Sequence, residues 1–265
     1  MLKFYPLFSG SSGNMYLVKS DNAKILIDFG VTFKAAKEAL KNIDVDIASI
    51  DAILVTHEHV DHVRGLARMA KMCNTNIFTT TKTYDEIYNK YFSNLESAPT
   101  FVKVEYDKEF EIKDFKILPF KVSHDAVMPV GYKVSCVDKT VTVATDLGYV
   151  DDNIYDCLKC SDLSVIEANY DTNLLMYGPY PYATKMRIQS ELGHLSNTDT
   201  SHIILNLAKD GKRNFILGHM SLNNNNASQA LFEVNTTLEK NGFNLSDFNI
   251  HVATRDFSDE VYTLW

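Results

Sequence analysis

The sequence predicts an α/β protein folded as a four-layer αββα sandwich, in which two β-sheets pack together and helices cover their outer faces. Two successive halves of the chain are each rich in short apolar runs followed by helical patterns. Clusters of glycine, serine, asparagine and aspartate separate these runs. No internal repeat, low-complexity tract or linker-like change of composition interrupts the 265 residues. We therefore predict a single domain over residues 1–265.

The first half begins with three strands, divided by the Gly/Ser turn at residues 9–13 and by Asp21-Asn22. Thr32 has the side chain of a helix N-cap, and Phe33, Ala36 and Leu40 would share one face of the helix that follows. A helix passing through Leu66 and Met69 follows a fourth strand. The expected ranges are strands 2–7, 15–19, 24–28 and 52–55, a helix from 32 to 41, and strand, helix, strand over 76–104.

The second half repeats the pattern of strands followed by helices. The predicted strands are 115–122, 131–136, 141–144, 163–167, 214–217 and 250–254, and the predicted helices are 151–159, 197–208 and 227–240. Residues 177–182, Tyr-Gly-Pro-Tyr-Pro-Tyr, are expected to form a rigid aromatic loop.

Composition and the first residues of the chain indicate the compartment in which the protein is expected to act. No run approaches 18 consecutive apolar residues, so no membrane span is expected. The first residues lack the features of a signal peptide, which predicts a cytoplasmic protein. A net charge of −8 argues mildly against a broad basic groove for nucleic acid, although bound divalent cations would offset part of it.

The four cysteines fit a reducing compartment. Cys157 and Cys160 form a Cys-x-x-Cys pair in an expected helix, with no second pair or nearby histidine to complete a zinc site. We interpret them, with Cys73 and Cys136, as reduced structural thiols.

The strongest chemical signal follows the strand at 52–55. Four potential metal ligands fall within six positions, in the pattern His-x-His-x-Asp-His: His57, His59, Asp61 and His62. Imidazole and carboxylate together suit zinc, iron or manganese, and ligand pairs this close can serve two neighbouring ions. The alternative is a polar loop with surface histidines, but three of the eight histidines in six residues favour a metal site.

Three later strands end in further candidate ligands, His124, Asp146 and His219. Each alone is more often a cap or a surface group. Because the carboxyl ends of strands usually carry the functional loops, we expect them to join the motif. In this hypothesis His57, His59 and His124 hold one ion, Asp61, His62 and His219 hold a second, and Asp146 bridges both.

This ligand set, in this order, resembles that of the metallo-β-lactamase superfamily, whose αββα fold agrees with the predicted elements. Within it the chain is most similar to the YycJ (WalJ) branch, a more distant relation of RNase J and RNase Z. The similarity is carried by residues 8–15, 27–30, 144–149, 166–169, 178–181 and 193–197. Leu147 and Tyr170 depart from that branch at positions that are not metal ligands.

The resemblance implies a binuclear metallohydrolase with two divalent ions, zinc first and manganese or iron as alternatives. Two such ions lower the pKa of a bridging water toward ~7 and create the attacking hydroxide. Asp61 would bind metal and orient that hydroxide. His194 resembles the histidine that protonates the leaving group in related phosphodiesterases, whereas the alternative is a structural histidine before a helix capped by Ser196 or Asn197. Ser11, Asn14 and Ser196 are candidate phosphate contacts.

The predicted function is a metal-dependent phosphodiesterase acting on nucleic acid, a 5′ exonuclease as the branch implies. Three alternatives stay open: a hydrolase of a small cyclic phosphodiester, thioester or lactone, which the acidic charge favours; an oxygen-using single-iron enzyme, against which the intact Asp61, His62 and His219 argue; and a non-catalytic binding protein. The oligomeric state is not predicted.

Overall fold

The computed structural model describes residues 1–73, 75–93 and 99–265. Its backbone contacts divide the chain into two compact units. The first unit comprises Met1–Lys121, Ala126–Lys139 and Thr254–Trp265, and the second comprises Val122–Asp125 and Thr140–Ala253. Within the described ranges, no helix is both long and apolar enough to cross a membrane.

The first unit is built on a seven-stranded sheet with the strand order β14-β1-β2-β3-β4-β5-β6. Strands β14, β1, β2 and β3 pair antiparallel, and β3 to β6 pair parallel. Three more strands, β7 to β9, form an antiparallel set. The strands are β1 (Leu2–Phe8), β2 (Met15–Lys19), β3 (Lys24–Ile27), β4 (Ala52–Leu54), β5 (Asn76–Thr80), β6 (Phe101–Val104), β7 (Phe110–Ile112), β8 (Phe115–Lys121), β9 (Val130–Cys136) and β14 (Tyr262–Leu264).

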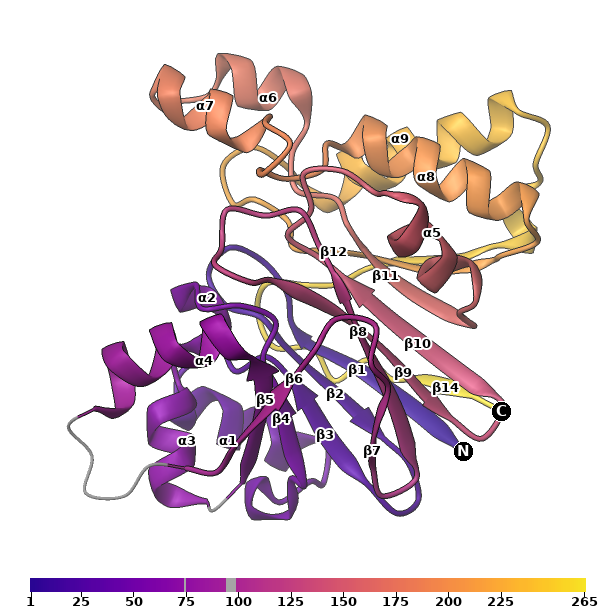
Figure 1. Cartoon of the computed structure of the whole chain (residues 1–265). Helices are drawn as coiled ribbons and strands as arrows, with labels where there is room; N and C mark the ends of the chain where they lie inside the picture. Colours follow the sequence, from indigo (N-terminus) through magenta and orange to yellow (C-terminus); the bar gives the residue numbers. More distant parts are fainter. Residues whose placement is uncertain (74, 94–98) are drawn as a thin grey trace. The chain divides into compact units, whose positions relative to one another are not determined.

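Helices of the first unit pack on one face of this seven-stranded sheet (Figure 1). They are α1 (Phe33–Asn42), α2 (Val60–Val63), α3 (Leu66–Met72) and α4 (Thr81–Ile87), with a 3₁₀ turn at Ile47–Ser49 and a π-helical turn at Tyr88–Phe92. The core between the layers joins strand residues such as Leu26 and Ile53 to Leu40 of α1 and Leu66 of α3, all fully buried. The ligand motif that follows β4 therefore stands on a rigid base.

The second unit contains four parallel strands in the order β13-β12-β11-β10. They are β10 (Lys139–Ala144), β11 (Leu163–Glu167), β12 (Asn214–Gly218) and β13 (Asn249–Val252). The helices are α5 (Asp152–Lys159), α6 (Thr172–Tyr177), α7 (Tyr182–Ile188), α8 (Asn197–Lys209) and α9 (Ala227–Lys240), with a 3₁₀ turn at Leu245–Asp247. Parallel strands bring their carboxyl ends to one edge, and Ala144, Glu167 and Gly218 end there.

Most predicted elements are confirmed to within two residues at each end. Thr32 caps α1 and Asp151 caps α5, because each side chain accepts a backbone N–H of the first turn. The helix expected after the motif is two short helices, α2 and α3. Residues 94–98 of the stretch predicted as strand, helix, strand lie outside the described residues.

The aromatic loop predicted at residues 177–182 is wrong at both ends. Tyr177 is the last residue of α6 and Tyr182 the first of α7, so only residues 178–181 connect them. The helices were missed because they are short. The Asp171 side chain caps the start of α6 by accepting the Leu174 N–H, and Pro181 immediately precedes α7. Strands β7 and β14, of three residues each, were also not predicted.

Candidate metal centre

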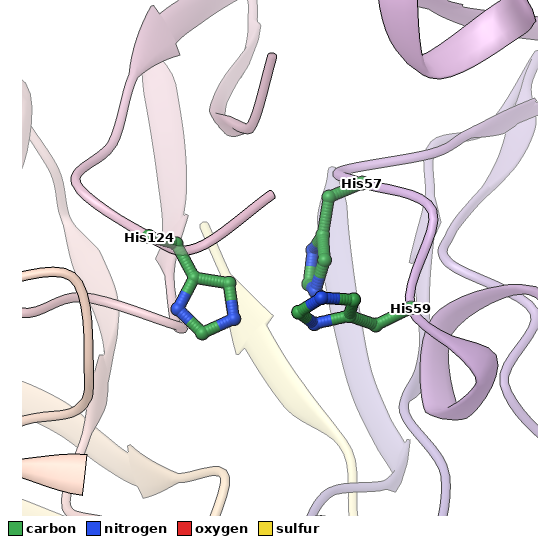
Figure 2. Close-up of side chains that lie close together, drawn as sticks. All are labelled: His57, His59 and His124. Carbon is green, nitrogen blue, oxygen red and sulfur yellow. The ribbon is translucent and has the colours of Figure 1, made fainter. Parts of the chain in front are cut away.

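The first ligand group consists of His57, His59, Asp61 and His62, which directly follow β4 and open α2. The imidazole of His57 lies edge-on to that of His59, with ring centroids 4.6 Å apart (Figure 2). Its centroid is 4.1 Å from that of His62. Asp61 Oδ2 lies 3.6 Å from His62 Nε2. The structure therefore brings together all four residues of the motif.

A buried carboxylate, Asp28, orients this group from the end of β3. Asp28 Oδ2 accepts a hydrogen bond from His62 Nδ1 at 2.7 Å, and the backbone N–H and hydroxyl of Thr56 donate to the same carboxylate. The Thr56 hydroxyl also lies 3.0 Å from His57 Nδ1. Burial raises the pKa of Asp28, and the charge of His62 with the hydrogen bonds from His62 and Thr56 opposes this rise.

The Gly/Ser turn fastens the motif from the other side. The Asn14 N–H donates to the Asp61 carbonyl at 2.8 Å, and Asn14 Nδ2 lies 3.1 Å from His62 Nε2. A Cβ on Gly30 would fall 1.6 Å from the Asp61 carbonyl oxygen, so the close approach requires glycine. Asn14 is buried under the motif, whereas Ser11 is exposed at the turn. Their roles as phosphate contacts stay predictions.

The second ligand group lies in the second unit and comes from four strand ends. His124 follows β8, Asp146 follows β10, Glu167 closes β11 and His219 follows β12. His194 lies on the loop before α8. Ligand atoms of Asp146, Glu167, His194 and His219 all lie within 4.8 Å of one another. Asp146 Oδ1 is 3.4 Å from His219 Nε2 and 3.7 Å from His124 Nε2.

Glu167 holds two histidines of this group with one oxygen. Its Oε1 accepts hydrogen bonds from His194 Nδ1 at 2.7 Å and from His219 Nδ1 at 2.8 Å, while Oε2 accepts the N–H groups of Leu147 and Leu195. Burial alone would raise the pKa of Glu167, but the charge of His194 and the hydrogen bonds from both histidines outweigh it and hold the pKa well below its usual value. Glu167 is therefore a buried carboxylate.

His124 is held by a backbone carbonyl instead. Its Nδ1 donates to the Gly193 carbonyl at 3.2 Å, and the residue is almost fully buried. Burial lowers the pKa of His124, and the Asp146 and Glu167 charges oppose that shift. The neutral imidazole that a metal requires is thus the favoured form.

These contacts fit a divalent metal. Histidines that bind metals almost always donate the other ring N–H to a carboxylate or carbonyl, which fixes the ring and its tautomer. His62, His124 and His219 each have such an acceptor at Nδ1: Asp28, the Gly193 carbonyl and Glu167. The ligating nitrogen of each would then be Nε2.

Three residues of the two groups and their supports share an uncommon backbone conformation. Asp28, Asp146 and His219 have φ angles of 61°, 59° and 51°, in the left-handed region that side chains other than glycine rarely adopt. Asp28 and His219 directly follow β3 and β12, and Asp146 lies two residues after the end of β10, so all three stand in turns at strand ends. Strain of this kind concentrates at functional sites.

Comparison with known proteins identifies the family. Residues 23–220 match the family model described as beta-lactamase superfamily domain. The chain belongs to this superfamily. It is a hydrolase of the superfamily, and the predicted relation to the YycJ (WalJ) branch is confirmed. It is 34% identical over 251 residues to the exodeoxyribonuclease YycJ of Bacillus anthracis, covering 94% of each chain. It is 36% identical over 224 residues to the exodeoxyribonuclease WalJ of Streptococcus pneumoniae serotype 2, covering 84% of this chain and 83% of that protein.

Solved structures confirm the fold class. The metallo-β-lactamase fold protein YhfI of Bacillus subtilis matches with a TM-score of 0.75 at 16% identity, over 99% of this chain and 100% of that one. Human tRNase Z, short form, matches with a TM-score of 0.67 at 15% identity over 99% of both chains. The predicted metallo-β-lactamase fold is therefore correct.

The sequence prediction missed the residues that hold the ligands in place. Glu167 and Asp28 received no role, although both are acidic residues that close strongly apolar strands, the same signal that pointed to Asp146. Thr56 was also missed, since a threonine before the motif carries no chemical pattern. Ser196 is confirmed as the N-cap of α8, where it forms a capping box with Asp199.

Proposed function

We propose that this protein is a binuclear metal-dependent phosphodiesterase that degrades DNA from a 5′ end. In this proposal His57, His59 and His124 hold one divalent ion, Asp61, His62 and His219 hold the second, and Asp146 binds both. One observation carries it: in both ligand groups a buried acceptor engages Nδ1 of a ligand histidine, as Asp28 does for His62 and Glu167 for His219. Zinc is the proposed ion, because it accepts this mixture of imidazole and carboxylate.

The bound ions would supply Lewis acidity and a water of lowered pKa. The protein's own groups would do the rest. Asp61 would accept a hydrogen bond from the attacking water and orient it. His194, held at Nδ1 by Glu167, would present Nε2 to protonate the leaving oxygen, and the Glu167 carboxylate would stabilise the imidazolium before transfer.

DNA is the proposed substrate because the relatives named exodeoxyribonucleases cover most of this chain. Ser11, Asn14 and Ser196 remain proposed phosphate contacts, of which Ser11 is exposed in the present structure. The cytoplasm is the proposed compartment, where DNA is accessible.

The experiment combines metal analysis with defined substrates. Purified protein should contain two equivalents of zinc by elemental analysis and degrade 5′-phosphorylated DNA with release of 5′ nucleotides. His57→Ala should abolish both metal at one site and hydrolysis. Protein that binds metal yet cleaves neither DNA, RNA nor bis-p-nitrophenyl phosphate would contradict the proposal.

A small-molecule phosphodiesterase is the second candidate, favoured by the net charge of −8. Faster hydrolysis of a cyclic nucleotide than of any DNA would select it. A single-iron oxygenase is disfavoured by the intact set Asp61, His62 and His219. Stoichiometric iron together with oxygen consumption would select that alternative.

A further inference from the structure

A short helical hairpin stands beside the loops of the second ligand group. It consists of α6, the connection 178–181 and α7, and we call residues 172–188 the tyrosine hairpin. Figure 1 shows α6 and α7 as a pair of helices distinct from the neighbouring pair α8 and α9. A small core holds the hairpin together, formed by Tyr170, Leu175 and Ile188 with Tyr180 packed against them.

The outer surface of the tyrosine hairpin is apolar and aromatic. Tyr177 is 89% exposed and Tyr182 is 72% exposed, and Leu174 and Met176 are also exposed. None of these four side chains belongs to the hairpin's own core. Two exposed tyrosines and two exposed aliphatic side chains within nine residues, outside the local core, favour contact with a ligand that has a flat apolar face.

The hairpin is fastened at its start and at its turn to the loop that follows His219. The Asp171 N–H donates to the Asn224 carbonyl at 2.8 Å, and Asn223 Nδ2 donates to the Tyr180 hydroxyl at 3.2 Å. A Cβ on Gly178 would fall 2.8 Å from Asn224 Oδ1, so the turn lies directly against this loop.

The other end of the hairpin continues into the loop of His194. The His194 N–H donates to the Ile188 carbonyl at 2.9 Å, and a Cβ on Gly193 would fall 2.2 Å from that same oxygen. The hairpin is thus joined to the backbone of His194 and to Asn223 and Asn224, in the loop that follows His219. A ligand held on its outer surface would have a fixed relation to them.

Charge on the hairpin suits a polyanion. Residues 172–188 include Lys185 and Arg187 and no aspartate or glutamate, within a chain of net charge −8. Arg187 forms an ion pair with Asp125, and Lys185 Nζ donates to the Met176 carbonyl at 2.7 Å, which ties α7 to α6. The Lys185 charge therefore lies close to the exposed end of α6.

We propose that the tyrosine hairpin is a stacking platform for single-stranded DNA, in which Tyr177 and Tyr182 stack on unpaired bases of the strand being hydrolysed. This inference rests on the proposed function and names single-stranded DNA as the form of the substrate. Aromatic side chains beside a basic group bind single strands without sequence preference, because every base offers a flat face. Continuity with the loops of His194 and His219 favours DNA over a protein partner.

The test compares Tyr177→Ala/Tyr182→Ala with the matched control Tyr177→Phe/Tyr182→Phe, which keeps the rings. Steady-state kinetics would use a 5′-phosphorylated single strand of about 12 nucleotides, within the usual site size, and bis-p-nitrophenyl phosphate. We expect the alanine variant to raise KM for the strand by roughly ten-fold for each tyrosine that stacks. The phenylalanine variant should stay near wild type, and all three proteins should hydrolyse the small substrate equally.

Binding to the same strand, labelled with fluorescein, would be measured by anisotropy in the His57→Ala background and should show the same ranking. Alanine variants that retain wild-type KM and affinity for the strand would overturn the platform while leaving the nuclease intact. Equal losses on bis-p-nitrophenyl phosphate would also overturn it, because the tyrosines would then support the site and not the strand. An altered sedimentation coefficient with unchanged DNA kinetics would instead identify a protein contact and reject the platform. A wild-type protein inactive on every DNA would remove the proposed function itself.

Discussion

The two ligand groups differ in how the chain builds them. The first is contiguous: four ligands occupy residues 57–62 and share one short segment after β4. The second gathers His124, Asp146, His194 and His219 from segments up to 95 residues apart (219 − 124), and brings them together in the second unit. Three of them lie on loops that follow β8, β10 and β12, and His194 lies on the loop before α8. Local sequence thus creates one group, and sheet topology creates the other.

The supports differ in the same way. The first group is oriented by several separate contacts, from Asp28, Thr56 and Asn14. In the second, the single carboxylate of Glu167 holds both His194 and His219. A distributed support should tolerate the loss of one member better than a shared one, and this difference can be tested.

Removing a metal ligand should reduce activity more than any other change, and the loss should be equal for the two ligand groups. We expect His57→Ala and His219→Ala each to lose one metal equivalent and to reduce hydrolysis of bis-p-nitrophenyl phosphate to the level of chelator-treated wild type. Both groups contribute ligands to the proposed reaction, so loss of either group should abolish it. Elemental analysis and initial rates measure the outcome.

His202→Ala is the matched control, because His202 lies on α8 and belongs to neither group. It should keep full metal content and rate. If His219→Ala kept the wild-type rate, the second group would have no part in catalysis.

Replacing each supporting carboxylate by its amide should affect the two ligand groups to different extents. Loss of a residue that orients a metal-bound histidine typically lowers metal affinity or activity by about 10- to 100-fold. We expect Glu167→Gln to reach the upper end of that range, since two histidines lose the negative charge of the acceptor that they share. Asp28→Asn should stay near the lower end, because Thr56 and Asn14 still contact the first group. Zinc affinity in a competition titration and kcat on bis-p-nitrophenyl phosphate give the comparison.

The control is a double variant. If Glu167 acts partly through His194, then adding His194→Ala to Glu167→Gln should cost less activity than His194→Ala costs alone. Equal losses for Glu167→Gln and Asp28→Asn would reject the contrast between shared and distributed support.

The contrast also explains what could be predicted. The contiguous motif can be recognised in the sequence, because four potential ligands in six positions rarely serve a purpose other than metal binding. His124, Asp146 and His219 were inferred because each ends an apolar strand, and the structure brings these three together in one unit. Asp28 and Glu167 show the same signal but were overlooked, since the pattern does not say whether a carboxylate binds a metal or a histidine.

Helices were harder to predict where they depend on tertiary packing. Helices α8 and α9, of 13 and 14 residues, were predicted from their helical pattern. Helices α6 and α7 have six and seven residues, too few for a reliable period, and depend on the core around Leu175 and Ile188. Short elements of this kind follow from tertiary contacts more than from local preference.

Close backbone approach should be tested at Gly30. A Cβ there would meet the Asp61 carbonyl oxygen at 1.6 Å, so Gly30→Ala must displace the ligand motif or the Gly/Ser turn. Overpacking of this kind typically costs about 1–3 kcal/mol, and we expect a lower denaturation midpoint together with weaker zinc binding. Gly242→Ala is the control: its Cβ meets nothing within 4 Å and its φ is +81°, so it should lower stability without affecting zinc. Normal zinc affinity in Gly30→Ala would show that the motif has room to move.

The smallest effects should come from the helix caps, one in each unit. Ser196 is buried and its hydroxyl accepts the Asp199 N–H, while the Asp199 carboxylate accepts the Ser196 N–H. Thr32 is exposed, and its hydroxyl accepts the Ala35 N–H at 3.2 Å. Loss of a cap costs about 0.5–2 kcal/mol. We expect Ser196→Ala to fall at the upper end of that range and Thr32→Ala at the lower, measured by urea denaturation of the metal-free protein.

Ser196→Asn separates the cap from the proposed phosphate contact. Asparagine is as good an N-cap as serine, and its uncharged amide does not repel the Asp199 carboxylate that the Ser196 hydroxyl contacts, so it should restore stability while removing the hydroxyl. We expect Ser196→Asn to fold like wild type, and to raise KM for DNA only if the Ser196 hydroxyl touches the substrate. If Ser196→Ala raised KM without lowering stability, the residue would act in phosphate binding and its capping hydrogen bond would contribute little.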